Sequence, residues 1–452
     1  MNLHKSWISN SIFWLAMAFV VYMPLHIFIS QSFSVVTGGL EVWKAAKDVL
    51  LVVLVPLLLF ISYKKSLFQD QFFRRFIAIA GLYTLLHGSF VLFNNDFTGW
   101  YAAVIGSVYN TRLFGYFLLG YLAIKLTGKE HLKKLITASV IVAFFVALFG
   151  SIQYFLPADF LEPFGYSVER GVKPLFFIDD KPDLPRVMST IRDPNKLGAY
   201  LIMPMLFTGM ALAKTRWNRE FFIRPIRRSV LSVFIATYTF CMFVTFSRGA
   251  VLSLAVALGV LFILLYGARV FRIVKRYWWL CLAVLAIMTL GVVATRDTYL
   301  FKNYVFHADE ATTEADPNEK RLILYDEAVD RIEDQPEGYG PGSAGLVSVK
   351  SDGKQILTEN YFLQVTHEVG IIGVMLFGAL LTGLGLQLFY AAQHRNAVAI
   401  VLFASFISYI FYSLLVHLWS NEAVALQFWL LTGALLELKS ASDKRGVSNR
   451  GT

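Results

Sequence analysis

Long apolar runs constrain the fold of this chain more than any other feature. A helix needs roughly 20 apolar residues to cross the hydrocarbon core of a bilayer, and many segments reach that length. Only 16% of the 452 residues are charged, and 56% are hydrophobic. The sequence therefore predicts an all-α, polytopic membrane helix bundle of about twelve transmembrane helices. The expected spans lie near residues 11–30, 48–63, 75–95, 102–124, 135–156, 197–213, 229–246, 249–266, 277–295, 361–389, 398–417 and 421–438.

The distribution of charge predicts how the bundle is oriented. With both termini in the cytoplasm, the cytoplasmic segments hold 24 of the 41 Lys and Arg residues and only five acids. Cytoplasmic loops of membrane proteins carry such an excess of basic residues. The net charge of +10 thus reflects topology rather than a nucleic-acid partner. We expect a multi-pass protein of the inner (plasma) membrane, with membrane lipid around it.

Two long segments are predicted on the external side of this single membrane domain, residues 1–452. Residues 157–196 are rich in Pro and charge and form the first external loop. Residues 296–359 form a larger loop between the ninth and tenth helices. Within it, apolar residues at helical spacing predict an amphipathic helix near 318–333, lying on the membrane or capping a cavity.

Two arginines are candidate ligands for an anion. Arg248, in Thr-Phe-Ser-Arg-Gly-Ala, lies where two apolar runs meet at the external edge. An arginine there is costly unless it is paired or faces water, so Arg248 either marks a tight turn or binds an anion in a cavity. Arg321 opens the amphipathic helix and is either a solvated surface charge or a second anion ligand.

A third group of candidate residues lies just before the tenth predicted helix and in its first turns. Glu359 and Asn360 stand at its beginning, where acids and Asn are good helix caps. The functional alternative for Glu359 is a general base near the membrane surface. His367 and Glu368 lie two turns further on, and a buried, hydrogen-bonded pair is the simple interpretation of them.

The first external loop ends on a polar stretch with two arginines. It contains Arg186 and Arg192, and Asp193-Pro194-Asn195 predicts a turn and a helix start. We see no P-loop, nucleotide-binding glycine turn, zinc spacing or nucleophile elbow. No metal or other cofactor is therefore expected.

Taken together and in order, these stretches resemble the O-antigen ligase family, which also includes many O-antigen polymerases. The resemblance spans roughly residues 186–373 by motif and the whole chain by helix count. The matching pieces are Arg186, Ser189, Thr190, Asp193 to Gly198; Ser247 to Ala250; Lys320 to Leu322, Tyr325, Ala328 and Gly338 to Gly342; and Glu359 to Tyr361, Leu363 and Gly370 to Gly373.

The resemblance implies a membrane glycosyltransferase of polysaccharide and lipopolysaccharide biosynthesis in the cell envelope. Such enzymes transfer a glycan from an undecaprenyl diphosphate carrier to an acceptor sugar hydroxyl on the external, periplasmic face. The two key arginines of the family fall on Arg248 and Arg321, and Arg186 and Arg192 are expected to help bind the diphosphate. Ligases of the family have a histidine where this chain has Glu359, so we expect Glu359 to act as the base. Asn195, Asn360 and His367 are expected to support the site.

Several functions remain open at the level of sequence. The acceptor is a glycan or glycolipid, and a ligase cannot be told from a polymerase of carrier-linked repeat units. Direct displacement without a metal would invert the anomeric centre. A glycolipid transporter or flippase is an alternative of a different class, although the paired broken helices typical of transporters are not evident. A non-catalytic member of the family is a further alternative, because the family histidine is missing.

Overall fold

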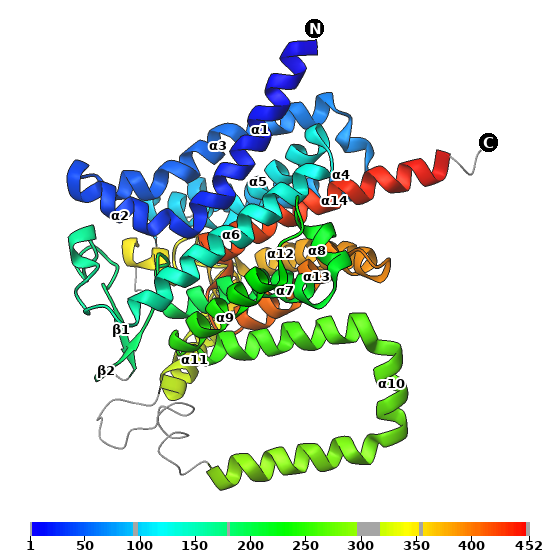
Figure 1. The fold of residues 1–452 in the computed structure, drawn as a ribbon. Helices are drawn as coiled ribbons and strands as arrows, with labels where there is room; N and C mark the ends of the chain where they lie inside the picture. Colours follow the sequence, from blue (N-terminus) through cyan, green and yellow to red (C-terminus); the bar gives the residue numbers. More distant parts are fainter. Residues whose placement is uncertain (1, 94–97, 179–180, 296–316, 352–355, 449–452) are drawn as a thin grey trace.

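The computed structural model describes residues 2–93, 98–178, 181–295, 317–351 and 356–448 (Figure 1). Residues 296–316, which belong to the predicted large external loop, lie outside the described residues. The α-helices are α1 (Asn2–Tyr22), α2 (His26–Thr37), α3 (Leu40–Lys64), α4 (Gln71–Phe93), α5 (Trp100–Thr127), α6 (Glu130–Gln153), α7 (Pro194–Ala213), α8 (Thr215–Phe221), α9 (Arg228–Val244), α10 (Arg248–Thr295), α11 (Pro317–Asp334), α12 (Tyr361–Gln393), α13 (Ala397–Ser413) and α14 (Gln427–Ser448). Shorter elements are η1 (Met23–Leu25), η2 (Leu67–Gln69), η3 (Glu162–Phe164), η5 (Gly345–Lys350), η6 (Leu418–Ser420), η7 (Glu422–Leu426), and strands β1 (Phe176–Ile178) and β2 (Lys181–Arg186).

The helices confirm an all-α membrane protein of many passes. In the described part of the chain, seven helical segments are long and apolar enough to span a bilayer. Two shorter apolar helices, α9 and α13, accompany them. The predicted count of twelve is not confirmed. The seven segments are Trp7–Thr37, Leu40–Lys64, Gln71–Phe93, Glu130–Gln153, Pro194–Ala213, Arg248–Gly267 and Tyr361–Gln393.

Helix α10 covers two of the predicted spans, 249–266 and 277–295, and the basic segment between them. It consists of two helices that meet at a kink, because the backbone angles of Tyr277 are not helical. The kink falls at the first residue of the second predicted span. The first part of α10, Arg248–Gly267, is one of the seven segments given above. Beyond its first part, α10 projects away from the bundle (Figure 1).

The centre of the bundle is the contact between α5 and α14. Helix α5 is buried on every side over most of its length, as expected for a helix surrounded by other helices. Gly120 on α5 and Gly433 on α14 allow the two backbones to approach closely. A Cβ atom at Gly120 would collide with the carbonyl oxygen of Leu430, and one at Gly433 with that of Phe117. Small residues serve the same purpose at many helix contacts within membranes.

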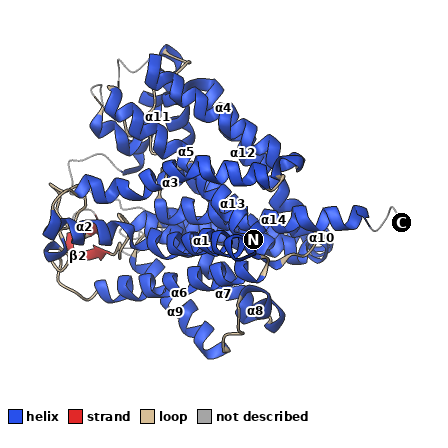
Figure 2. Cartoon of the chain, turned by 90° about the horizontal axis from the view of Figure 1, so that it is seen from above, coloured by secondary structure: helices blue, strands red, loops and turns tan. Residues whose placement is uncertain are grey.

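The loops sort into two groups that lie at different places on the bundle. Segments near Lys133, Arg219 and Asn396, all predicted to be cytoplasmic, line one shallow pocket together. Segments predicted to be external gather elsewhere, around the beginnings of α7 and α12 and the end of α13. The antiparallel pair β1–β2 belongs to this second group and lies at the edge of an otherwise helical molecule (Figure 2).

Candidate active site

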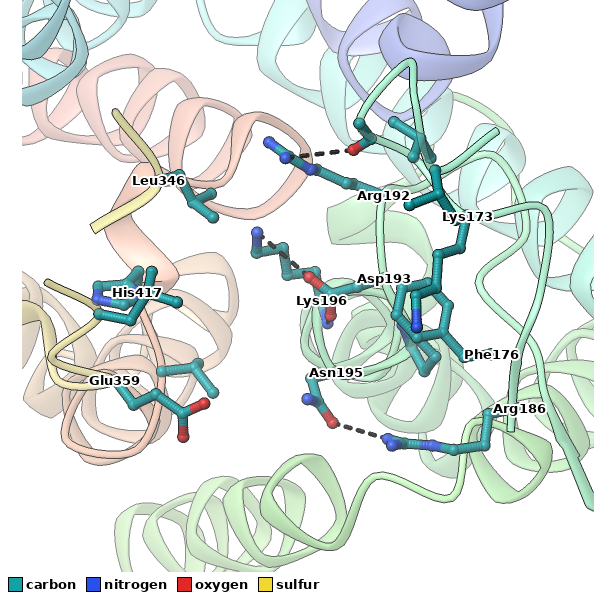
Figure 3. A pocket seen from close by; sticks show the side chains of 16 residues that line it. Lys173, Phe176, Arg186, Arg192, Asp193, Asn195, Lys196, Leu346, Glu359 and His417 are labelled. Atoms are coloured by element: carbon teal, nitrogen blue, oxygen red, sulfur yellow. Dashed lines mark hydrogen bonds and ion pairs between the residues drawn. The ribbon is translucent and has the colours of Figure 1, made fainter. Parts of the chain in front are cut away.

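A cavity of about 490 Å³ lies among the segments predicted to be external. Its walls come from the first external loop, the start of α7, the segment before α12 and the segment after α13 (Figure 3). Predicted site residues Arg186, Arg192, Asn195 and Glu359 all line it. The other lining residues are Val168, Gly171, Val172, Lys173, Phe176, Asp193, Pro194, Lys196, Leu346, Leu357, Val416 and His417.

One wall of the cavity is basic. Arg186 donates from Nε to the carbonyl oxygen of Thr245 at 3.1 Å and from a terminal nitrogen to Oδ1 of Asn195 at 3.0 Å. Arg192 donates to the carbonyl oxygen of Gly171 at 3.4 Å. The side chain of Lys173 lies over the ring of Phe176, with 5.7 Å between Nζ and the ring centre. Several cations at one wall suit an anionic ligand such as a diphosphate.

The sequence around Asp193 explains how the start of α7 is built. Asp193 caps the helix by accepting from the backbone N–H of Lys196 at 3.0 Å. Pro194 occupies the first turn, where its missing N–H and fixed backbone angle cost nothing. The same carboxylate pairs with Nζ of Lys196 at 3.2 Å. Asn195 is thereby held at the cavity wall beside Arg186.

The opposite wall carries the predicted carboxylate. Oε2 of Glu359 lies 2.8 Å from Nε of Arg321, which reaches it from α11. The structure therefore brings together two predicted residues that are 38 positions apart. Asn360 caps α12, accepting from the backbone N–H groups of Phe362 at 2.9 Å and Leu363 at 3.2 Å. Arg321 lies beside the cavity, since it contacts a residue of its lining.

Arg248 begins α10 next to this site but is not among the lining residues. Its neighbour Ser247 lies 3.1 Å from the hydroxyl of Tyr412, which donates in turn to the carbonyl oxygen of Asn195 at 3.1 Å. Thr245, three residues before Arg248, accepts from Arg186. The side chain of Arg248 is exposed. The residues just before Arg248 are hydrogen-bonded to the basic wall, Thr245 directly to Arg186 and Ser247 through Tyr412 to Asn195.

His367 and Glu368 are both buried and hydrogen-bonded, as the simple interpretation of them predicted, but their hydrogen-bond partners are other residues and each holds the Gly338–Gly342 loop. Nδ1 of His367 lies 3.0 Å from Oγ of Ser343, and its ring stacks on Tyr339. Glu368 accepts from the backbone N–H of Gly342 at 3.2 Å. His367 is fully buried and does not line the cavity, so its contact with the site is indirect.

Sequence reasoning missed three polar residues of the cavity. Lys173 and Lys196 add charge to the basic wall, and His417 stands beside Glu359. Nε2 of His417 lies 3.1 Å from the hydroxyl of Thr358, the residue before Glu359. Burial lowers the pKa of His417 to about 3, with a smaller contribution from the charge of Lys196. The available signal was an ionisable residue at the very end of the predicted span 398–417.

A buried cluster of charges holds the segment after α13 in place. The guanidinium of Arg112, on α5, lies 3.0 Å from Asp48 and 3.3 Å from Glu422. It also donates to the carbonyl oxygen of Ser420 at 2.8 Å. Lys47 lies 2.9 Å from Asp48, so the cluster contains two cations and two carboxylates. Arg112 thus faces the interior of the bundle, and its contacts tie η6 and η7 to α3 and α5.

In the described residues, no group of three or more His, Cys, Asp or Glu side chains could hold a metal ion. The chemistry that these residues can support is the binding of an anion at the basic wall and the acceptance of a proton or hydrogen bond at Glu359 and His417.

The fold and these walls define a polytopic, helical membrane protein with a polar cavity at one end. Comparison with known proteins then shows which family the chain resembles. Residues 231–378 match the family model described as O-Antigen ligase. The match contains Arg248, Arg321 and Glu359, whereas Arg186, Arg192 and His417 lie outside it.

A curated relative points the same way. The chain is 23% identical over 256 residues to an "O-antigen polymerase" of Salmonella muenchen. The alignment covers 54% of this chain and 58% of the relative, so it spans little more than half of either protein. The resemblance to the O-antigen ligase and polymerase family that the motifs predicted is therefore confirmed.

Proposed function

We propose that this protein is a membrane glycosyltransferase that moves a glycan from an undecaprenyl diphosphate carrier to an acceptor sugar hydroxyl. The observation that carries the proposal is one cavity with a basic wall facing a carboxylate. Cations bind the leaving diphosphate, and the carboxylate binds the attacking hydroxyl. The family match over the part of the chain that holds Arg248, Arg321 and Glu359 supports the same function.

The basic groups would act on the leaving group. As the bond between the anomeric carbon and the diphosphate oxygen breaks, negative charge grows on that oxygen. Arg186, Arg192, Arg248 and Arg321 would stabilise this charge, and their interaction strengthens as the bond breaks. Arg321 also pairs with Glu359, which places a cation next to the reacting carboxylate. No metal is required in this scheme, because the guanidinium groups neutralise the diphosphate.

Glu359 would act on the acceptor. Its carboxylate takes the proton of the acceptor hydroxyl while the hydroxyl oxygen forms the new bond to the anomeric carbon. A single displacement of this kind inverts the anomeric centre. Glu359 stands where ligases of the family have a histidine, so a carboxylate would perform the same proton transfer.

A polymerase of carrier-linked repeat units is the second candidate within the same chemistry. The curated relative named as an O-antigen polymerase favours it. In that case the acceptor is the terminal sugar of another carrier-linked repeat. Purified protein incubated with carrier-linked repeats alone should then produce longer chains, whereas a ligase requires a separate glycolipid acceptor.

We place the cavity on the external face of the inner membrane, with both termini in the cytoplasm. The charge distribution supports this orientation. Single cysteines introduced at Glu169 and at Arg219 test it in intact cells. A membrane-impermeant maleimide should label the first position and not the second, and the reverse pattern would place the cavity in the cytoplasm.

The decisive experiment measures transfer from undecaprenyl-diphosphate-linked glycan in nanodiscs. Arg248→Ala and Arg321→Ala should each lower turnover at least ~100-fold, because each removes a cation from the leaving group. Arg219→Ala, on the side predicted to be cytoplasmic, is the matched control and should retain activity. Full activity in both variants would contradict the diphosphate role. Movement of glycolipid across the bilayer without a new glycosidic bond would instead support a flippase.

A further inference from the structure

We propose that the wall formed by Glu359 and His417 is the subsite of the acceptor sugar, and that Nδ1 of His417 accepts a hydrogen bond from a hydroxyl of this sugar. The inference rests on the proposed function and extends it to a residue outside the family match. The bound hydroxyl would be a neighbour of the one that attacks, since the attacking hydroxyl gives its proton to Glu359.

The hydrogen bonds around Thr358 determine which nitrogen of His417 carries the proton. The Thr358 hydroxyl donates to the carbonyl oxygen of Asn360 at 2.9 Å. A hydroxyl has one proton, so at 3.1 Å Thr358 must accept from Nε2 of His417. Nε2 is therefore protonated, and Nδ1 has a free electron pair that can accept a hydrogen bond.

Nδ1 is the nitrogen that remains available. Within the described part of the chain, Nδ1 makes no hydrogen bond. It is also not fully buried, because it is not one of the buried polar atoms there that lack a partner. His417 retains 8% of its surface, and it lines the cavity. The accessible Nδ1 is thus placed to meet a ligand in the cavity.

The two walls differ in charge and therefore suit different ligands. Figure 3 shows His417 and Glu359 facing the wall of Lys173, Arg186 and Arg192. The buried imidazole stays neutral, because its pKa is lowered to about 3. The lone pair of Nδ1 and the carboxylate of Glu359 accept hydrogen bonds from sugar hydroxyls, whereas the cations of the facing wall suit a diphosphate. Arg321, which pairs with Glu359, borders the hydroxyl side and adds a cation there. The cavity therefore has an anion side and a hydroxyl side.

His417 is also held rigidly. Thr358 fixes one edge of its ring. Three residues further along the chain, the carbonyl oxygen of Ser420 accepts from the buried Arg112 at 2.8 Å. A group already held in place loses little conformational freedom when it binds a ligand, which suits a recognition role.

Two substitutions separate recognition from a purely structural role. In His417→Gln the side-chain amide can replace Nε2 and keep the bond to Thr358, but Nδ1 is lost. In His417→Asn the amide oxygen can replace Nδ1, but the bond to Thr358 is lost. Binding of a panel of methyl hexosides and methyl N-acetylhexosaminides to protein in nanodiscs is measured by saturation-transfer NMR, with inorganic diphosphate binding measured in parallel.

We expect His417→Gln to weaken binding of at least one glycoside about tenfold, the equivalent of one hydrogen bond. His417→Asn should stay within about threefold of the wild type, and diphosphate binding should be unchanged in both. The reverse order, with Gln retaining and Asn losing affinity, would overturn the inference. Absence of glycoside binding to the wild type would also overturn it.

A second pair of variants serves if both substitutions at His417 prevent folding. Leu357 lies on the His417 wall and Val168 on the other side, and both side chains are exposed. Leu357→Trp should abolish glycoside binding and spare diphosphate binding, whereas Val168→Trp should spare glycoside binding. The opposite result refutes the subsite. These binding measurements need no turnover, so wild-type protein that binds glycosides but transfers nothing would contradict the proposed function alone.

Discussion

Glu359 occupies a backbone conformation that its residue type seldom adopts. Its φ is +46°, in the left-handed region that favours glycine. The ion pair with Arg321 is partly exposed, with 41% of the Glu359 side chain accessible, so it contributes little stability. A strained residue in a weak ion pair is poorly explained by folding, and this favours a functional role for the carboxylate.

The first prediction at the residue scale concerns this carboxylate. Glu359→Gln keeps the size of the side chain but removes the base, so turnover should fall by about 10²- to 10⁴-fold. Glu162→Gln, an exposed acid in the same external group of loops, is the matched control and should leave turnover unchanged. Turnover is measured with saturating carrier-linked glycan, and unchanged rates in Glu359→Gln would assign the base elsewhere.

The second prediction follows from the buried, neutral state of His417. Its pKa is about 3 in the folded protein and about 6.5 when the chain unfolds. Between these values the unfolded state binds the extra proton, so stability falls as the pH is lowered from about 6.5. The decrease in Tm between pH 7 and pH 5 should be smaller in His417→Asn than in the wild type. Substitution of the exposed His394 by Asn should leave the decrease unchanged.

At the scale of elements, the contact of α5 with α14 depends on glycine. Gly433→Ala places a methyl group against the carbonyl oxygen of Phe117 and should destabilise the protein by at least ~1 kcal/mol. Gly81 on α4 is also helical, but no described atom lies within 4 Å of a Cβ built there. Gly81→Ala should therefore stabilise by about 0.5–1 kcal/mol. Thermal unfolding in detergent measures both, and equal shifts of the same sign would contradict the close contact.

At the scale of the whole molecule, the cluster around Arg112 ties three separate parts of the chain together. Asp48 comes from α3, Arg112 from α5, and Ser420 and Glu422 from the segment that carries His417. Two acids and two bases balance one another in a buried place. Such a cluster is costly to disrupt, because removal of one partner leaves a buried charge uncompensated.

The corresponding prediction is the cost of Arg112→Met. The substitution should destabilise the protein by about 3–5 kcal/mol, because Asp48 and Glu422 keep only Lys47 as a cation. It should also release the carbonyl oxygen of Ser420 and weaken glycoside binding at the His417 wall. Arg216→Met, which breaks an exposed ion pair, should change stability by less than about 1 kcal/mol. Thermal unfolding compares the two.

The sequence by itself determined the class of the protein. The length of the apolar runs follows from the thickness and apolar nature of the bilayer core, so the helices and the membrane class could be predicted from the order of residues. The motifs around Arg248, Arg321 and Glu359 likewise predicted the resemblance to the O-antigen ligase and polymerase family. The number of spans was less accessible, because helices such as α9 and α13 have 17 residues and lie at the lower limit of the length that a span needs.

Only the tertiary structure decided which side chains share one cavity. The pairing of Arg321 with Glu359, the basic wall of Lys173 and Arg186, and the position of His417 all join segments distant in sequence. Their proximity depends on how packed helices bring loop ends together, and no local pattern encodes that distance. For the same reason His367, expected at the site, holds the Gly338–Gly342 loop instead.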